Sequence, residues 1–384
     1  MGQGPTGTTL TNARLLTPHG VRAGWLRAEN QRITALGTGE PPESDAEPVD
    51  AEGRWVMPGA VDIHIHGGAG AAFTDADPEQ AMRIVEFNRS CGVTTLVGGL
   101  VTAAPEDTLA QITALAEVAD AGGVAGVYLE GPYIAPSKCG AHDPELLREP
   151  DPAEFGRMLK AGRGHVRMIT VAPELPGALE LIRAAVSEGV VAAVGHTEAT
   201  YDQARAAFDA GATVATHLYN QMRPLHHREP GPIAAALNDE RVIVELINDG
   251  VHVHPGAARL VFDDAGGDRV ALVTDAMSAT GLGDGEYTLG DLRVRVEDGR
   301  ARIAETGQIA SSTIVLPDAV RRAVHTMGVS LEAAARAATA VPARALDLPG
   351  VGSLTAGGKA DLLLLDDDLS VAGVMHHGSW VRRP

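Results

Sequence analysis

The chain has 384 residues, which is enough for a large barrel together with an accessory unit. Its formal net charge of -19 argues against nucleic acid or an anionic membrane as the main partner. No apolar stretch reaches membrane-spanning length, the N-terminal region does not resemble an export signal, and the two cysteines, Cys91 and Cys139, are expected to be reduced. We therefore expect a cytoplasmic protein.

Both ends of the chain have the pattern of β-structure. Apolar and polar residues alternate as in antiparallel strands over 9–18, 21–30, 31–37, 352–368 and 371–383. We predict one small, discontinuous β-sandwich domain that combines residues 1–56 with residues 346–384. The stretch 40–50, rich in proline and acidic residues, is predicted to be a loop.

Residues 57–345 alternate apolar runs with helical stretches rich in Ala, Leu and Glu. Strands are predicted near 61–66, 94–101, 125–130, 166–172, 190–196, 213–219, 242–247 and 270–275. Helices are predicted at 78–90, 106–120, 177–188 and 200–210. This order predicts an α/β fold, a TIM-like (β/α)8 barrel, with a doubly wound open sheet as the competing fold. The segment 285–305 has an Asp-Gly turn between alternating runs and is predicted to be an inserted hairpin.

Six potential metal ligands lie near the C-terminal ends of the predicted strands: His64, His66, Glu130, His196, His217 and Asp275. Residues two apart on a strand point to the same face, so His64 and His66 can hold one ion together. A lone buried histidine is more often structural, and simple packing of that pair is the alternative. Imidazole and carboxylate ligands without thiolate suit zinc, iron or manganese at a site open to water. A metal-dependent hydrolase is therefore favoured, because six such residues recur in register.

These residues occur in motifs that resemble a known family. The runs PGAVDIHIHG, YLEGPYIAPSKCGAH, VGHTEATYDQARAAFDAGATVATHLYNQM, NDGVHVHP, LVTDAMSATG and GSLTAGGKADLLLLD together resemble the N-acetylglucosamine-6-phosphate deacetylases of the amidohydrolase superfamily. The resemblance covers nearly the whole chain. It implies hydrolysis of the acetamide of N-acetyl-D-glucosamine 6-phosphate to D-glucosamine 6-phosphate and acetate, in amino-sugar catabolism and cell-wall sugar recycling.

The resemblance also implies how metal ions are held. Glu130, His196 and His217 would form the core site, whereas His64, His66 and Asp275 would form a second site with Glu130 as the bridge. One or two divalent ions per subunit are expected, with zinc first and iron, manganese, cobalt or cadmium as alternatives. Some family members lack the His-x-His pair, and the predicted fourth strand here has no lysine for the carboxylated-lysine bridge of other relatives.

Asp275 is the candidate for proton transfer, because it ends a strand beside the metal ligands. Its alternative role is a helix N-cap. The chain has no GxSxG elbow, and no obvious Ser-His-Asp arrangement points to a covalent serine mechanism.

Substrate-binding residues are expected in the loops beyond the metal ligands. By resemblance, His142 and His252 would contact the sugar, its acetyl carbonyl or its phosphate, and Ala141 and Ile309 would lie near the substrate. Asn220 and Gln221 would offer donors to the phosphate. Arg228 has the planar fork that suits phosphate, and in relatives this arginine reaches the neighbouring subunit, which implies a homodimer. A solvated charge run beside His226 and His227 is the alternative for Arg228.

Other functions stay open at this point. A deacetylase for the galactosamine epimer is the nearest alternative. A cyclic-amide hydrolase is a second, and the missing strand-four lysine counts against it. An inactive barrel that senses sugar phosphates is a third, and retention of every ligand together with Asp275 counts against it.

Overall fold

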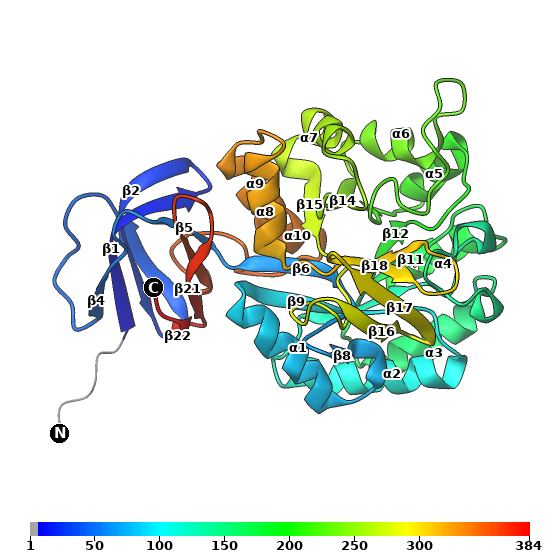
Figure 1. Cartoon of the computed structure of the whole chain (residues 1–384), viewed down its shortest axis with the longest axis horizontal. Coiled ribbons are helices and arrows are strands. Elements are labelled where there is room, and N and C mark those ends of the chain that lie inside the picture. Colours follow the sequence, from blue (N-terminus) through cyan, green and yellow to red (C-terminus); the bar gives the residue numbers. More distant parts are fainter. Residues whose placement is uncertain (1–6) are drawn as a thin grey trace.

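The computed structural model describes residues 7–384, and its larger part is a parallel barrel surrounded by helices (Figure 1). The eight barrel strands are neighbours in chain order. They are β6 (Ala60–Ile65), β9 (Val93–Leu100), β10 (Gly126–Glu130), β11 (Val166–Val171), β12 (Val191–Val194), β13 (Val214–Ala215), β14 (Ile243–Ile247) and β15 (Val270–Val273). This is the (β/α)8 order, so the predicted fold class is confirmed.

One helix follows each barrel strand. These helices are α1 (Pro78–Ser90), α2 (Pro105–Asp120), α3 (Pro152–Gly162), α4 (Ala178–Ser187), α5 (Tyr201–Asp209), α6 (Gly231–Leu237), α7 (Pro255–Arg269) and α8 (Leu316–His325), and then come α9 (Leu331–Ala337) and α10 (Ala340–Ala345). Local sequence sets several of their starts. The carboxylates of Asp77 and Asp151 accept the second N–H of α1 and α3, and a proline with its pre-set φ follows each.

The strands are mainly apolar on both faces, because helices cover the outside and side chains fill the interior. Every residue of β6, β9, β10 and β14 is buried. Inside the barrel, Ile63, Val97, Tyr128 and Met168 pack in one cluster, and Val341 of α10 joins it. The interior is therefore a packed core, and the chemistry is confined to the strand ends.

The barrel closes between its first and last strands through contacts that also place candidate ligands. The N–H of Asp275 donates to the carbonyl of His64 (2.8 Å), and the N–H of His66 donates to the carbonyl of Ala276 (2.8 Å). Behind them, the hydroxyl of Thr274 donates to Asp62 (2.6 Å). An open sheet has no such seam, so the competing doubly wound fold is excluded.

The two ends of the chain together form one mixed sheet, with antiparallel and parallel strand pairs, beside the barrel (Figure 1). Its strands are β1 (Gly7–Thr17), β2 (Gly20–Glu29), β3 (Arg32–Gly37), β4 (Glu47–Asp50), β5 (Trp55–Pro58), β20 (Leu362–Leu365), β21 (Val371–His376) and β22 (Ser379–Arg382). The sheet bends around one apolar core that includes Leu10, Leu26, Ile33, Leu364 and Met375. The first six residues of the predicted 1–56 unit lie outside the described part of the chain.

One prediction for this sheet is wrong. The stretch 40–50 is not a loop throughout, because Glu47–Asp50 forms β4 and pairs in parallel with β1. Its proline stands at an edge of the sheet, where a missing N–H is tolerated.

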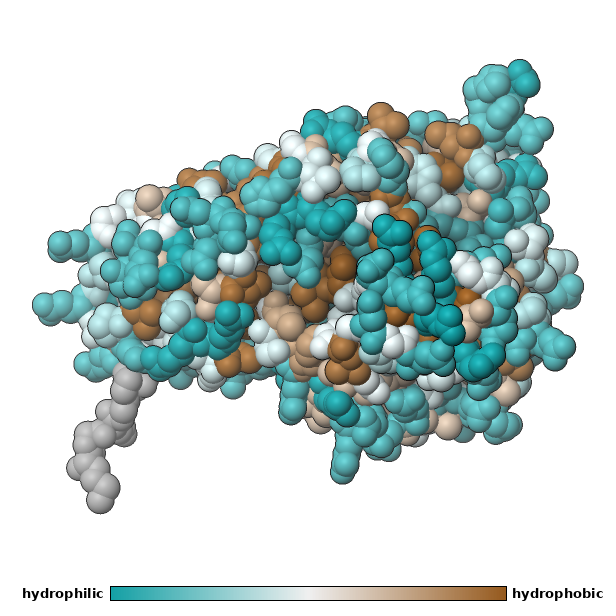
Figure 2. All heavy atoms as spheres, viewed as in Figure 1, coloured by the Kyte–Doolittle hydropathy of each residue, from teal (hydrophilic) through white to brown (hydrophobic). Residues whose placement is uncertain are grey.

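The segment predicted as a hairpin is larger than expected. It forms a four-stranded sheet, the inserted sheet, from β16 (Gly285–Leu289), β17 (Leu292–Glu297), β18 (Arg300–Ile303) and β19 (Ile309–Ser311). The Asp298-Gly299 turn joins β17 to β18 with φ of 51° and 69°, which suits a two-residue hairpin loop. Because the inserted sheet connects β15 to α8, it lies over the C-terminal end of the barrel, and its outer surface is mainly hydrophilic (Figures 1 and 2).

Candidate active site

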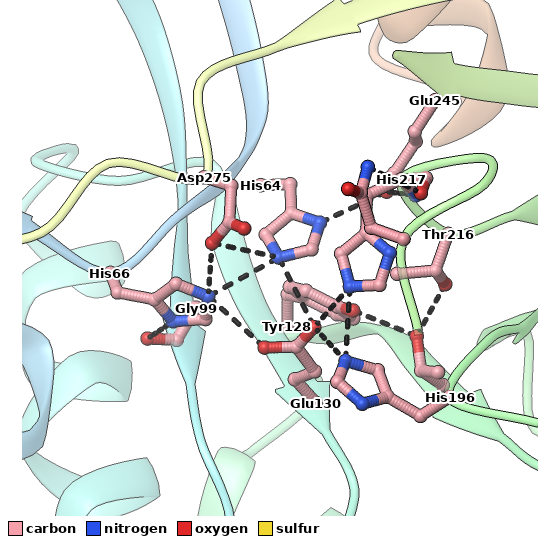
Figure 3. Close-up of polar contacts among 12 residues, drawn as sticks. His64, His66, Gly99, Tyr128, Glu130, His196, Thr216, His217, Glu245 and Asp275 are labelled. Atoms are coloured by element: carbon pink, nitrogen blue, oxygen red, sulfur yellow. Dashed lines mark hydrogen bonds and ion pairs between the residues drawn. The ribbon is translucent and has the colours of Figure 1, made fainter. Parts of the chain in front are cut away.

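Six side chains converge at the C-terminal end of the barrel (Figure 3). His64 lies in β6 and His66 directly follows it, whereas Glu130 is the last residue of β10. His196, His217 and Asp275 each stand two residues beyond the end of β12, β13 and β15. The structure thus brings together all six residues that the sequence suggested as ligands.

Glu130 occupies the centre of this cluster. Its Oε1 lies 3.0 Å from Nε2 of His196 and 3.0 Å from Nε2 of His217. Its Oε2 lies 3.1 Å from Nε2 of His66, which is 3.2 Å from Oδ1 of Asp275. One carboxylate therefore contacts both groups of ligands, which is the arrangement a bridging ligand requires.

The hydrogen-bond partners of the histidines fix which nitrogen faces the cluster. Nδ1 of His196 donates to the carbonyl of Lys138 (2.7 Å), and Nδ1 of His66 donates to the carbonyl of Gly99 (3.1 Å). A carbonyl oxygen only accepts, so the proton of each neutral ring is on Nδ1 and the Nε2 lone pair points inward.

These inward nitrogens test whether the residues fit a metal ion. Nε2 of His196 lies 3.0 Å from Nε2 of His217, and Nε2 of His64 lies 3.2 Å from Nε2 of His66. Facing lone pairs at this distance repel one another unless a cation lies between or beside them. Four imidazoles and two carboxylates, all buried, are a donor set that suits a divalent transition metal.

Glu245 supports the cluster from behind and was missed in the sequence. It is fully buried in β14, and its Oε2 accepts from Nδ1 of His64 (2.9 Å) and from the N–H of His217 (3.2 Å). A carboxylate behind a ligating histidine orients the ring and makes it more basic. The available signal was a charged residue in the middle of the apolar run VIVELI.

The pKa values of the buried groups shift in different directions, according to burial and to the charges that face each group. Burial would raise the pKa of Glu130, but the charge of His64 and the close contacts with His142, His196 and His217 outweigh burial and hold that pKa well below its ordinary value. Burial would lower the pKa of His66, but Asp275 and Glu130 outweigh it and raise that pKa to about 9. The buried carboxylate of Asp275 likewise has a lowered pKa, mainly because His66 and His64 face it. Asp275 is therefore ionised and able to accept a proton.

Three of the clustered residues have a left-handed backbone, which non-glycine residues rarely adopt. The φ angles are 46° at His196, 28° at His217 and 49° at Asp275. Such conformations cost on the order of 1–3 kcal/mol each and concentrate at functional sites. Here they turn each side chain from the end of its strand toward the shared centre.

A cavity of about 450 Å³ opens over the cluster. Six of the seven predicted substrate-binding residues line it: Ala141, His142, Asn220, Gln221, His252 and Ile309. Arg228 does not line the cavity of its own chain. It is exposed, and its guanidinium contacts Nε2 of His227 at 2.9 Å. Val101, Gly140, Leu289, Arg302, Gln308 and Ala310 also line the cavity and were not predicted.

The two predicted substrate histidines differ in charge. Nδ1 of His142 accepts from the N–H of Thr102 (3.1 Å), and burial lowers the pKa of His142 to about 4, so a neutral ring presents Nε2–H to the cavity. Burial would lower the pKa of His252 as well, but Asp249 at 2.7 Å outweighs it and raises that pKa. His142 is therefore a neutral donor, whereas His252 favours the cationic form.

Comparisons with known proteins agree with this geometry. The amidohydrolase family matches residues 55–381. N-acetylgalactosamine-6-phosphate deacetylase of Escherichia coli is 40% identical over 372 residues, covering 95% of this chain and 97% of that protein. N-acetylglucosamine-6-phosphate deacetylase of Homo sapiens is 36% identical over 346 residues, covering 86% and 84%. A variant of the Mycobacterium smegmatis N-acetyl-D-glucosamine-6-phosphate deacetylase, solved with N-acetyl-D-glucosamine-6-phosphate, has 48% identity and a TM-score of 0.95, covering 98% of this chain and 100% of that one.

Proposed function

The chain belongs to the amidohydrolase family, and we propose that it hydrolyses the acetamide of N-acetyl-D-glucosamine 6-phosphate to D-glucosamine 6-phosphate and acetate. The observation that carries the proposal is the cluster around Glu130 at the base of a cavity that also presents Asp275 and His142. The Mycobacterium smegmatis relative, 48% identical, has been solved with this sugar phosphate.

Metal ligation in the proposal follows the two groups of residues. Glu130, His196 and His217 would hold a core ion, and His64, His66 and Asp275 a second ion on the other side of Glu130. A bound divalent ion lowers the pKa of water to roughly 7 and polarises the amide carbonyl. We place zinc first, because borderline imidazole and carboxylate ligands suit it, with iron, manganese, cobalt and cadmium as alternatives.

Asp275 would transfer the proton, and His142 would stabilise the negative charge that develops on the carbonyl oxygen. Asp275 takes a proton from the attacking water and delivers it to the departing amine nitrogen, so that acetate and the free amine leave. Nε2–H of His142 donates to the oxygen of the acetyl carbonyl, where negative charge develops. Burial keeps His142 neutral, so it does not compete for that proton.

Substrate binding in the proposal uses the cavity walls. Ala141 and Ile309 contact the sugar, while Asn220, Gln221 and His252 face the phosphate. Arg228 of a neighbouring subunit completes the phosphate site in a homodimer, since the same residue lies outside the cavity of its own chain. Within residues 7–384, no helix is both long and apolar enough to cross a membrane. The free cysteines Cys91 and Cys139 support a cytoplasmic location.

Turnover of purified protein with defined substrates tests the function. We expect acetate release from N-acetylglucosamine 6-phosphate, and none from dihydroorotate, the control for a cyclic-amide hydrolase. Absence of turnover in metal-loaded protein would favour the sensor alternative and contradict the proposal. The same assay with N-acetylgalactosamine 6-phosphate decides the epimer, an alternative that the similarity to the Escherichia coli enzyme, 40% identical, supports.

A further inference from the structure

Arg302 stands out among the residues that line the cavity. It lies in β18 of the inserted sheet, and within residues 7–384 it is the single arginine or lysine of the cavity wall. The same wall contains the carboxylates of Glu130 and Asp275, in a chain of net charge -19. A dianionic ligand entering this cavity therefore meets one permanent side-chain cation from the same chain.

Stability of the inserted sheet does not explain Arg302. Arg293 and Arg295 lie on the same exposed face and pair with Glu305 (2.7 Å) and Glu286 (3.0 Å). Arg302 has no carboxylate within ion-pair distance in the described part of the chain, and its guanidinium donates to the carbonyl of Gly307 at 2.8 Å.

The position of Arg302 in the sheet is also unfavourable. It stands directly opposite Arg295 in the β17–β18 pair. Like charges that face each other across two strands destabilise a sheet. Arg302 is exposed and lines the cavity, so its guanidinium is accessible to a ligand from solution.

We infer that Arg302 binds the phosphate of the substrate and sets the preference for phosphorylated over unphosphorylated hexosamines. This inference rests on the proposed function and adds a cation from the same chain to the one expected from Arg228 of a neighbour. The planar fork of arginine matches phosphate oxygens, and its charge offsets the repulsion by the carboxylates of the cavity. No covalent step is involved, so Arg302 acts through substrate affinity.

Matched charge variants test the inference. Arg302→Gln should raise KM for N-acetylglucosamine 6-phosphate about tenfold, since one charge-assisted contact is lost, and leave kcat within about twofold. Activity on N-acetylglucosamine should not change. Arg302→Lys should recover part of the loss. Arg295→Gln, the control, removes the same charge from the same face, outside the cavity, and should behave as wild type.

Inorganic phosphate provides a readout independent of turnover. Its dissociation constant, measured by calorimetry, should rise about tenfold in Arg302→Gln and stay constant in Arg295→Gln. Thermal unfolding should show no loss of stability in Arg302→Gln, since a like-charge pair is relieved.

Equal effects of the two glutamine variants, or equal losses on both sugars, would overturn the role of Arg302. If metal-loaded wild type hydrolysed neither acetylated hexosamine phosphate, the proposed function would fail. The phosphate affinities of the variants would then decide the role of Arg302 by themselves.

Discussion

At the residue scale, three of the four histidines of the cluster are held by a group that does not face the cavity, whereas Nδ1 of His217 is buried without a hydrogen-bond partner in the described part of the chain. Glu245 stands behind His64, the carbonyl of Gly99 behind His66 and the carbonyl of Lys138 behind His196. These partners decide which ring nitrogen is free, so they decide whether the six residues can bind an ion at all.

Replacing Glu245 by Gln should weaken metal binding while the fold is kept. Gln has nearly the same shape, but it removes the charge that makes His64 more basic, and such changes typically cost 10–100-fold in metal affinity. Titration with a competing chelator measures the affinity. Glu154→Gln is the control, because Glu154 is also buried but contacts Tyr133 and Arg148. Equal affinities in all three proteins would show that Glu245 is only a packing residue.

Replacing Asp275 by Asn should preserve substrate KM and lower kcat by roughly a hundred- to ten-thousand-fold, since the amide cannot accept the proton. Asn tolerates the left-handed backbone at φ 49°, so the fold should be kept. Steady-state kinetics together with metal analysis separate the roles. Near-normal kcat would identify Asp275 as a cap, and loss of metal in parallel with kcat would identify it as a ligand alone.

His252 should make binding of a phosphorylated substrate depend on pH. Burial would lower the pKa of His252, but the carboxylate of Asp249 outweighs burial and raises that pKa. The ring therefore stays protonated to a higher pH than a free imidazole does. It loses its positive charge as the pH rises through the raised pKa. KM for the phosphorylated sugar should therefore increase above neutral pH, where the phosphate is already dianionic. Asp249→Asn should move that increase to lower pH. A KM profile of the unphosphorylated sugar with the same inflection would exclude His252 as the cause.

At the element scale, every candidate ligand is placed by the end of a barrel strand. β6 supplies His64 and His66 together, whereas β10, β12, β13 and β15 lead to one residue each. The seam between β6 and β15 fixes His64, His66 and Asp275 relative to one another through backbone hydrogen bonds. The ligands of the two proposed ions therefore come from different parts of the barrel.

Variants grouped by strand should separate the two ions. Replacing either His196 or His217 by Asn should remove the core ion and abolish turnover. Replacing both His64 and His66 by Asn should lower the metal content by about one equivalent and keep the core ion. Elemental analysis after dialysis gives the stoichiometry. Identical metal content in the two groups would contradict the division, and full activity of metal-free wild type would contradict metal catalysis.

At the scale of the whole molecule, the proposed homodimer depends on the surface around Arg228. Arg228 is exposed in the loop before α6, and the nearby Leu225 is 53% exposed. A single exposed leucine is ordinary on a protein surface, so the proposed homodimer depends on Arg228, which lies outside the cavity of its own chain.

Mixed dimers of Arg228→Ala and Asp275→Asn should regain activity that neither variant has alone. If Arg228 crosses the interface, one site of the mixed dimer combines an intact Asp275 with the intact arginine of the other subunit. Each variant is purified with a different tag, and kcat/KM of the doubly selected dimer is compared with both parents. Verified mixed dimers without recovery would show that Arg228 acts within its own chain or not at all.

The sequence by itself determined the barrel fold and the side chains that cluster at its end, because the signals for both lie in short segments of the chain. Continuous apolar runs such as VALV at 270–273 indicate buried parallel strands, and Asp-Pro pairs such as Asp77 and Pro78 indicate helix starts. A (β/α)8 barrel brings its strand ends to one face, so His64, Glu130 and His217 meet there once the strands are recognised.

Only the tertiary structure decided the contacts that depend on distant segments. Glu245 is a charge in an apolar strand until the fold places it behind His64, and Arg302 is a surface residue until the inserted sheet lies over the cavity. The strand β4 exists because β1 offers it an edge, although its own residues favour a loop. Left-handed φ at His196 and Asp275 is stabilised by the packing around them and not by local preference, because an isolated chain would relax such strain.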